Sequence, residues 1–182
     1  MYIFTCEHKW EAMLTCIYDA WASKKGHANI KLMLEPVEQY SLFDTYTHVD
    51  ADAKKAESVM RSVKNKISFQ LYRQLAYASM AYEKEILDLM YRVLIVGFSY
   101  GPDVLNMVMY REIMQFNQIY KRLGKEVNHF QEFIRFHEVQ KGVFVAHIEP
   151  KSRLVVALGP IFADRMPSDA STTFDALGTS RS

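Results

Sequence analysis

The sequence is poor in the features that mark several large classes of protein. Cys6 and Cys16 are its only cysteines, so neither a disulfide framework nor a zinc knot is indicated, and we expect two buried or half-buried thiols. No window of about 18 residues is both uncharged and apolar, so we expect no membrane span. The segment Met1–Cys6 is too short and lacks the basic start of a secretory signal. A reducing, cytoplasmic setting is therefore the expectation.

An excess of charge of one sign is missing as well. The 22 Lys/Arg and 21 Asp/Glu leave a net charge of +1, which gives no global case for nucleic-acid or membrane binding. Only the segment Arg111–Arg165 is mildly basic, with nine Lys/Arg against six Asp/Glu. There is no Gly-rich phosphate loop, no internal repeat and no visible Ser-His-Asp or Cys-His signature. A function must therefore be argued from the patterns that are present.

Helical periodicity is the first of these patterns. Apolar residues recur at helical spacing, and Asp50 or Asp52 and Ser68 stand where helix caps are expected. The expected helices cover about 8–23, 53–67, 68–78, 83–98 and 111–132. Short strands are expected at Tyr2–Thr5 and Ile30–Leu34. The fold class is therefore α+β: a mostly helical single domain over 1–167, a late antiparallel β-meander at about 133–158, and a loosely held tail over 168–182.

The stretch 125–158 is the most informative, because alternation replaces helical spacing there. Residues 140–142 form a three-residue loop that ends in glycine, a common hairpin connection. Residues 150–152 form a second short loop. The partners expected across the two loops are Val139–Val143, His137–Val145, Arg135–His147, Phe133–Glu149 and Glu149–Arg153.

This register gathers five ionisable side chains on one face of the meander, because alternate residues of a strand share a face. They are Arg135, His137, His147, Glu149 and Arg153. The two arginines suit a phosphate or a carboxylate, the histidines titrate near neutral pH, and the glutamate could orient a histidine or act as a base. The alternative is a solvated outer face on which the glutamate pairs with Arg153.

The helix before the meander adds one Glu-x-x-His pair, Glu126 and His129. Di-iron bundles need two such pairs and two further carboxylates, so a single pair is weak evidence for a metal site. We therefore expect no metal and no cofactor.

Several segments together resemble a bacterial family of uncharacterised proteins linked to DNA metabolism and DNA repair. The matching segments span most of residues 1–166: WEAMLTCIYDAW, DADAKKAESV, Glu126 with FIRF, HIEP and IFADRM. The resemblance implies a role in handling DNA, together with a radical-SAM protein or a uracil-DNA glycosylase-like domain. By position it singles out Glu126, Arg135, Phe136, Glu149 and Arg165, of which Phe136 falls on the core face.

The chain also departs from the family pattern. Asn128 stands where the family tends to have histidine, and Glu132 stands where it tends to have glycine. Relatives end in an apolar closing strand, of which only Phe174 and Asp175 are matched here.

Three hypotheses follow. The first is an accessory DNA-repair or DNA-modification protein that binds nucleic acid or presents it to a partner, with Arg135, Arg153 and Arg165 on the phosphates. The second is a stand-alone hydrolase or lyase that uses the Arg135, His137, His147 and Glu149 face, with Glu126 nearby. The third is a protein-interaction subunit without chemistry, consistent with ten methionines and 13% aromatic residues.

Overall fold

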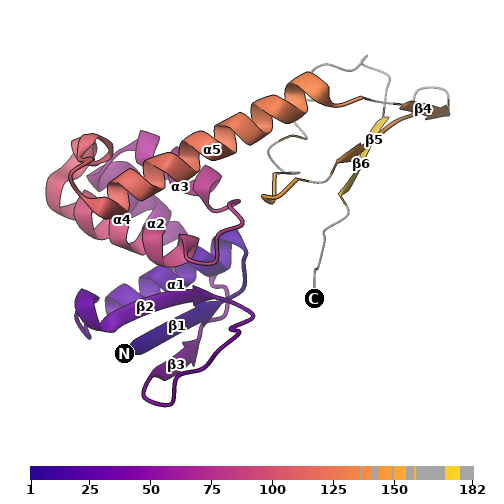
Figure 1. The fold of residues 1–182 in the computed structure, drawn as a ribbon. Helices are drawn as coiled ribbons and strands as arrows, with labels where there is room; N and C mark the ends of the chain where they lie inside the picture. Colours follow the sequence, from indigo (N-terminus) through magenta and orange to yellow (C-terminus); the bar gives the residue numbers. More distant parts are fainter. Residues whose placement is uncertain (136, 141–142, 149, 155–157, 159–170, 177–182) are drawn as a thin grey trace. The chain divides into compact units, whose positions relative to one another are not determined.

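The computed structural model describes residues 1–135, 137–140, 143–148, 150–154, 158 and 171–176 (Figure 1). Contacts divide the chain into two compact units. The first unit contains 1–79 and 83–119, and the second contains 80–82 and 120–182. The predicted domain boundary at residue 167 falls outside the described residues.

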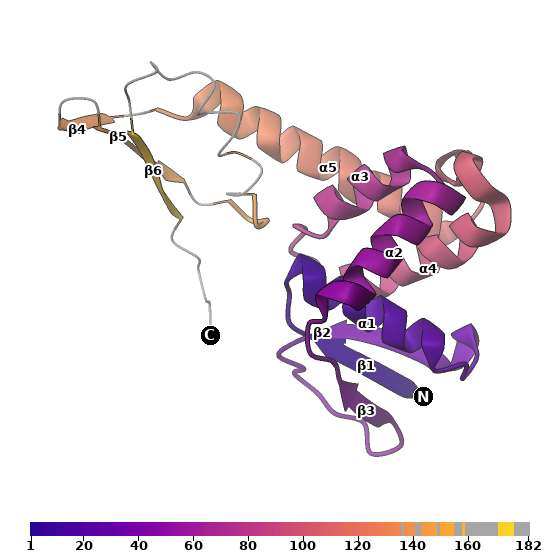
Figure 2. The ribbon, with the colours of Figure 1, turned by 180° about the vertical axis from the view of Figure 1, so that it is seen from behind.

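The first unit is built on a three-stranded parallel sheet. Strands β1 (Tyr2–Cys6), β2 (Ile30–Leu34) and β3 (Thr45–His48) lie in the order β2-β1-β3. Helix α1 (Trp10–Ala22) makes the crossover from β1 to β2 that a parallel pair requires. Figures 1 and 2 show α1 against the sheet and α2 (Ala53–Lys66) beyond it. Strand β3 was not predicted, because turn residues around Asp44 obscure its pattern.

The remaining helices of the first unit begin and end near the predicted residues. Asp52 caps α2 by accepting hydrogen bonds from the amides of Lys54 and Lys55, and Ser68 caps α3 (Phe69–Ala78). Helix α4 covers Ile86–Tyr100. Short 3-10 helices occupy His27–Asn29 and Gly101–Asn106. A long helix α5, Arg111–Phe133, continues from the first unit into the second.

Gly97 lies inside α4 and is buried. A Cβ at this position would lie 2.9 Å from Ile67 Cδ1 and 3.5 Å from Leu71 Cδ2. The absence of a side chain therefore lets α4 approach the corner between α2 and α3 closely. This approach places the next residue, Phe98, beside α1 and α2.

The second unit holds a three-stranded sheet in the order β4-β5-β6. β4 (His137–Gln140) and β5 (Val143–Ile148) form the predicted antiparallel hairpin, and His137 pairs with Val145 as predicted. An irregularity between Glu138 and Gln140 then places Gln140, not Val139, opposite Val143. One extra residue in a strand has this effect on the register.

The prediction of a third antiparallel strand in the meander is wrong. Residues 151–153 form bends, and the amide of Leu158 donates to the carbonyl of Leu154 at 2.9 Å, which is a helical spacing. Instead, β6 (Ser171–Ala176) pairs with β5 in parallel, so the second sheet is mixed. Residues 171–176 thus form a strand within the segment that the sequence assigns to a loosely held tail. The predicted α+β class holds, but the antiparallel meander does not.

No single helix among the described residues is long and apolar enough to cross a membrane. Ile86–Asn106 and Arg111–Phe133 pass that test of length and composition only when taken together, and they are bent by 53° at the break between them.

Candidate functional site

Glu126, predicted as a site residue, anchors a loop. Its Oε1 accepts hydrogen bonds from the amides of Lys151 at 2.8 Å and Ser152 at 3.1 Å. Its Oε2 accepts from the Ser152 hydroxyl at 2.9 Å. Ser152 and Leu154 are buried beside this anchor. The carboxylate therefore satisfies backbone donors of the bend 151–153, which overlaps the second short loop expected at 150–152.

The other predicted site residues that the structure describes lie on different elements of the second unit. Arg135 is exposed and lies between α5 and β4, outside either strand. Arg153 is exposed in the bend, where its amide donates to the carbonyl of Met80 at 2.8 Å. His137 lies on β4, and His147 lies on β5 opposite Asp175 of β6. Arg135 and Arg153 thus lie outside the strands in which they were predicted.

Glu149 and Arg165 lie outside the described residues. Their predicted roles, like those of the histidines, stay predictions.

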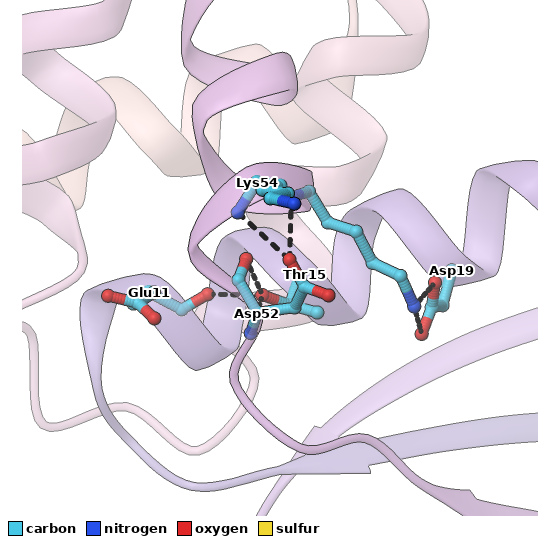
Figure 3. Close-up of polar contacts among 6 residues, drawn as sticks. Glu11, Thr15, Asp19, Asp52 and Lys54 are labelled. Carbon is cyan, nitrogen blue, oxygen red and sulfur yellow. Dashed lines mark hydrogen bonds and ion pairs between the residues drawn. The ribbon is translucent and has the colours of Figure 1, made fainter.

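The first unit contains a different candidate site, between helices that include α1 and α2. A hydrogen bond and an ion pair connect these two helices (Figure 3). The buried Thr15 hydroxyl accepts from the amide of Asp52 at 3.0 Å and lies 2.8 Å from the carbonyl of Glu11, to which it donates. One turn further along α1, Asp19 binds the ammonium of Lys55 at 2.8 Å. Asp19 raises the pKa of Lys55, mainly by this hydrogen bond. These two interactions therefore connect α1 to the beginning of α2.

Beyond these ties, α1, α2 and α4 enclose a hollow of about 460 Å³, which we call the Trp21 groove. Among the residues that line it are Tyr18 and Trp21 of α1, Ser58, Ser62 and Lys66 of α2, and Phe98 of α4. The rings of Trp21 and Phe98 meet edge to face with centroids 5.2 Å apart. One wall is thus aromatic and the other is polar.

The polar wall is regular because its three side chains stand four residues apart on α2, which brings them onto one side of the helix. Within the part of the chain that the structure describes, Ser58, Ser62 and Lys66 have no hydrogen-bond or ion-pair partner. Their donors therefore remain available to a molecule in the groove.

A second hollow, of about 380 Å³, is also lined by Trp21. Lys24, Lys25 and His27 line it, and it shares Trp21 and Ala22 with the Trp21 groove. His27 packs on the indole with centroids 4.5 Å apart, and its Nδ1 lies 2.7 Å from the hydroxyl of buried Tyr91. Burial raises the pKa of Tyr91 to about 12, so this phenol stays protonated at neutral pH.

Arg92 fixes the back of this second hollow. Its guanidinium donates to the carbonyl of His27 at 2.6 Å and also to the carbonyl of Ile30. Asp88, one turn earlier on α4, accepts from the amide of Leu32 at 3.0 Å. Side chains of α4 therefore hold the turn before β2 and β2 itself, and keep His27 beside Trp21.

The segment from α2 to α3 also carries a concentration of positive charge. Residues 53–73 contain six Lys/Arg and one Asp/Glu. The Lys64 ammonium lies 4.0 Å from the ring centroid of Tyr72 and 6.0 Å from that of Phe69. Phe69 is 59% exposed. We call Arg61, Lys64, Phe69 and Tyr72 the α2–α3 basic face.

A third polar feature lies at the carboxyl edge of the parallel sheet. His48 Nδ1 lies 2.7 Å from Glu35 Oε1, and its Nε2 lies 3.2 Å from Asp50 Oδ1. Hydrogen bonds from Thr5 and then His48 lower the pKa of Glu35, and Glu35 followed by Asp50 raises the pKa of His48. Among the described residues, no group of three or more His, Cys, Asp or Glu side chains is placed to hold a metal ion.

Reasoning from the sequence missed the Trp21 groove. The periodicity of the sequence locates α1 and α2 separately and does not show that they face one another. The signal that could have found it is the repeat of Ser58, Ser62 and Lys66 on α2 together with Trp21 on α1.

Cys6 and Cys16 are both free and buried, as expected. A hydrogen bond that the Cys16 thiol donates to Cys6, together with burial, raises the pKa of Cys16, so this thiol is unsuited to act as a nucleophile.

Residues 84–176 match the model of a family described as a domain of unknown function, DUF4130. No curated protein and no solved structure matches the chain. The matched segment contains α4, α5 and the second sheet, whereas α1 and α2 lie before it.

Proposed function

The chain belongs to the DUF4130 family, whose description assigns no function, and we propose that it is a nucleic-acid-binding protein that holds DNA for a partner. The observation that carries this proposal is the α2–α3 basic face, where the Lys64 ammonium lies 4.0 Å from the ring centroid of Tyr72 and 6.0 Å from that of the exposed Phe69. Single-stranded DNA needs both kinds of contact, since cations neutralise its phosphates and aromatic rings stack on its bases.

The basic face lies in a segment that is more positively charged than the whole chain. The net charge of the protein is +1, whereas residues 53–73, which include Arg61 and Lys64 of the face and four further Lys/Arg, carry a net charge of +5. Arg61 and Lys64 lie on one side of α2, and the ion pair of Arg61 with Glu57 at 2.8 Å is exposed. An exposed pair of this kind contributes little free energy, so a phosphate can compete for the guanidinium.

The aromatic part of the face favours an unpaired strand over a duplex. Phe69 is more than half exposed, and Tyr72 is held by the Lys64 ammonium and by an edge contact with Trp10 at 6.2 Å. Stacking of one base on such a ring stabilises a complex by about 1–3 kcal/mol. Bases are free to stack only where the strands are separated.

The test is the binding of a fluorescent single-stranded oligonucleotide followed by anisotropy at several salt concentrations. We expect Lys64→Gln to lower the slope of log affinity against log salt by roughly 0.7, because one phosphate contact is lost. We expect Phe69→Ala to weaken binding about tenfold. Matched controls are Lys31→Gln and Phe133→Ala, which remove an exposed lysine on β2 and an exposed aromatic at the end of α5. Absence of binding at low salt rejects the proposal.

The phosphate contacts predicted from the sequence are tested in the same assay. Arg135→Gln, Arg153→Gln and Arg165→Gln each lower the salt slope if these arginines bind the strand. An unchanged slope in all three variants, beside a reduced slope in Lys64→Gln, confines the contact to the α2–α3 basic face.

A second candidate function, protein interaction, is favoured by the loop between β2 and β3. Leu42 is 96% exposed, Phe43 is 94% exposed and Tyr40 is 68% exposed. Large apolar side chains at a loop tip are typical of a contact with another protein. The radical-SAM protein or glycosylase-like domain implied by the family resemblance is the proposed partner. Co-purification with this partner should be lost in a Leu42→Ser, Phe43→Ser variant that still binds DNA.

A further inference from the structure

We propose that the Trp21 groove binds one nucleobase together with its phosphate. The base lies against Trp21 and Phe98, and the phosphate meets the Lys66 ammonium. The inference deepens the proposed function and rests on it for the source of the ligand, an unpaired DNA strand. A free mononucleotide has the same chemistry, and the experiment below separates the two sources.

The size and walls of the groove suit this ligand. Its volume of about 460 Å³ lies within the usual range of small-molecule sites, roughly 300–1,000 Å³. Trp21 lies on α1 and Phe98 lies on α4, and both side chains are half-buried. Two different helices therefore position the aromatic rings that line the groove. Planar aromatic ligands gain most from such walls, because stacking adds to the burial of their surface.

The polar wall selects among planar ligands. Among the described residues that line the groove, Lys66 alone is charged, so an anionic group is favoured. Ser58 and Ser62 precede it by two turns and one turn of α2, and each hydroxyl both donates and accepts. A nucleobase edge presents donors and acceptors that this pair can satisfy. A purely apolar ligand, such as a lipid chain, would leave the two hydroxyls and the ammonium unsatisfied, which costs free energy.

The second hollow gives a reason to prefer a strand over a free nucleotide. It shares Trp21 and Ala22 with the Trp21 groove and places Lys24 and Lys25 beside them. A strand with one base in the groove would bring its neighbouring phosphate to these lysines. The two hollows together therefore fit successive nucleotides, and an oligonucleotide should bind more tightly than a mononucleotide.

The experiment uses the intrinsic fluorescence of the full chain. Trp10 and Trp21 are its only tryptophans, so Trp10→Phe leaves Trp21 as the single reporter. This variant is titrated with thymidine monophosphate and, separately, with an unlabelled single-stranded oligothymidine. We expect both to quench Trp21, the oligonucleotide at lower concentration. We expect Lys66→Gln in this background to weaken mononucleotide binding about tenfold, because a charge-assisted contact is lost.

Two matched variants make the result specific. Lys64→Gln removes a charge from the same helix outside the groove, and it should weaken the oligonucleotide but leave the mononucleotide unchanged. Ser62→Ala removes one hydroxyl and should weaken both ligands. Circular dichroism and the unfolding midpoint establish that each variant is folded.

The outcomes separate the two proposals. Binding of the oligonucleotide by anisotropy without any quenching of Trp21 overturns the groove inference and leaves the proposed function standing. Quenching by the mononucleotide that Lys66→Gln relieves supports the groove inference. If no oligonucleotide binds in the same experiment, the ligand is a free nucleotide and the DNA proposal fails. Quenching that Lys66→Gln and Ser62→Ala leave unchanged also overturns the groove inference.

Discussion

The two sheets of this protein differ in how their strands find one another. In the first unit β1 pairs in parallel with both β2 and β3, and a helix provides the crossover from β1 to β2. In the second unit β4 and β5 form a local hairpin. Strand β6 pairs with β5 in parallel, although residues 149–170 separate the two strands in the sequence. The comparison teaches that strand pairs close in sequence are encoded by the residues between them, whereas parallel pairs depend on packing elsewhere.

The largest expected effect comes from core substitutions that ask whether the two units unfold separately. Leu14 of α1 and Leu123 of α5 are buried at 2% and 0% exposure. We expect Leu14→Ala and Leu123→Ala each to lower the free energy of unfolding by about 2–5 kcal/mol through lost burial and a residual cavity. Hydrogen exchange should show that each change weakens amide protection mainly in its own unit. Equal weakening of both units by either variant would mean that they unfold as one.

The elements found from the sequence are those whose signals are local. Ser68, and Asp52 as one of two candidates beside Asp50, were identified as caps because a capping residue acts on amides two or three positions away. The pair His137–Val145 was found because a short hairpin loop fixes the register of its strands. The long helix over Arg111–Phe133 was found because its apolar period persists for many turns.

The elements missed have non-local causes. The predicted third meander strand was wrong because β5 pairs in parallel with β6, more than twenty residues later, instead of with the segment that directly follows it. Strand β6 was missed because a short polar stretch pairs only when β5 is already in place. The Trp21 groove was missed because it exists only where α1, α2 and α4 meet, and no single helix carries its signal.

The next effect concerns the tie that holds the first unit's helices. In Thr15→Val the amide and carbonyl of Asp52 lose the hydroxyl with which they hydrogen bond at 3.0 and 3.2 Å. Because Thr15 is buried, we expect a loss of about 1–3 kcal/mol in a denaturant titration. Thr47→Val, on exposed β3, is the matched control and should change stability little. If the two variants behave alike, the tie does not stabilise the α1–α2 pair.

A smaller effect is expected at the corresponding anchor of the second unit. Glu126→Ala removes the acceptors for Lys151 and Ser152, and we expect the amides of the 150–154 bend to lose about 1–2 kcal/mol of protection in hydrogen exchange. Glu132→Ala, on the same helix and exposed, is the control. Unchanged protection in Glu126→Ala would show that packing of Leu154 alone holds the bend, and would reopen a chemical role for Glu126.

The smallest effect is a pH dependence at the carboxyl edge of the first sheet. The pKa of His48 is raised above its usual value of 6.5, first by Glu35 and then by Asp50, so its contribution to stability is complete below 6.5 and is lost as pH rises through the raised pKa. The pKa of Glu35 is lowered from 4.5, so its contribution is present above 4.5 and is lost as pH falls through the lowered pKa.

The stability difference between the wild type and Glu35→Gln should therefore be greatest between these two transitions, in weakly acid to neutral solution. An NMR titration of the His48 ring tests the cause directly. Glu35→Gln should move its midpoint toward 6.5 by more than Asp50→Asn does, because Glu35 lies at 2.7 Å and Asp50 at 3.2 Å. The reverse order would show that the ring pairs mainly with the β3–α2 turn, and that the link from β2 to β3 across this edge is weaker than the geometry implies.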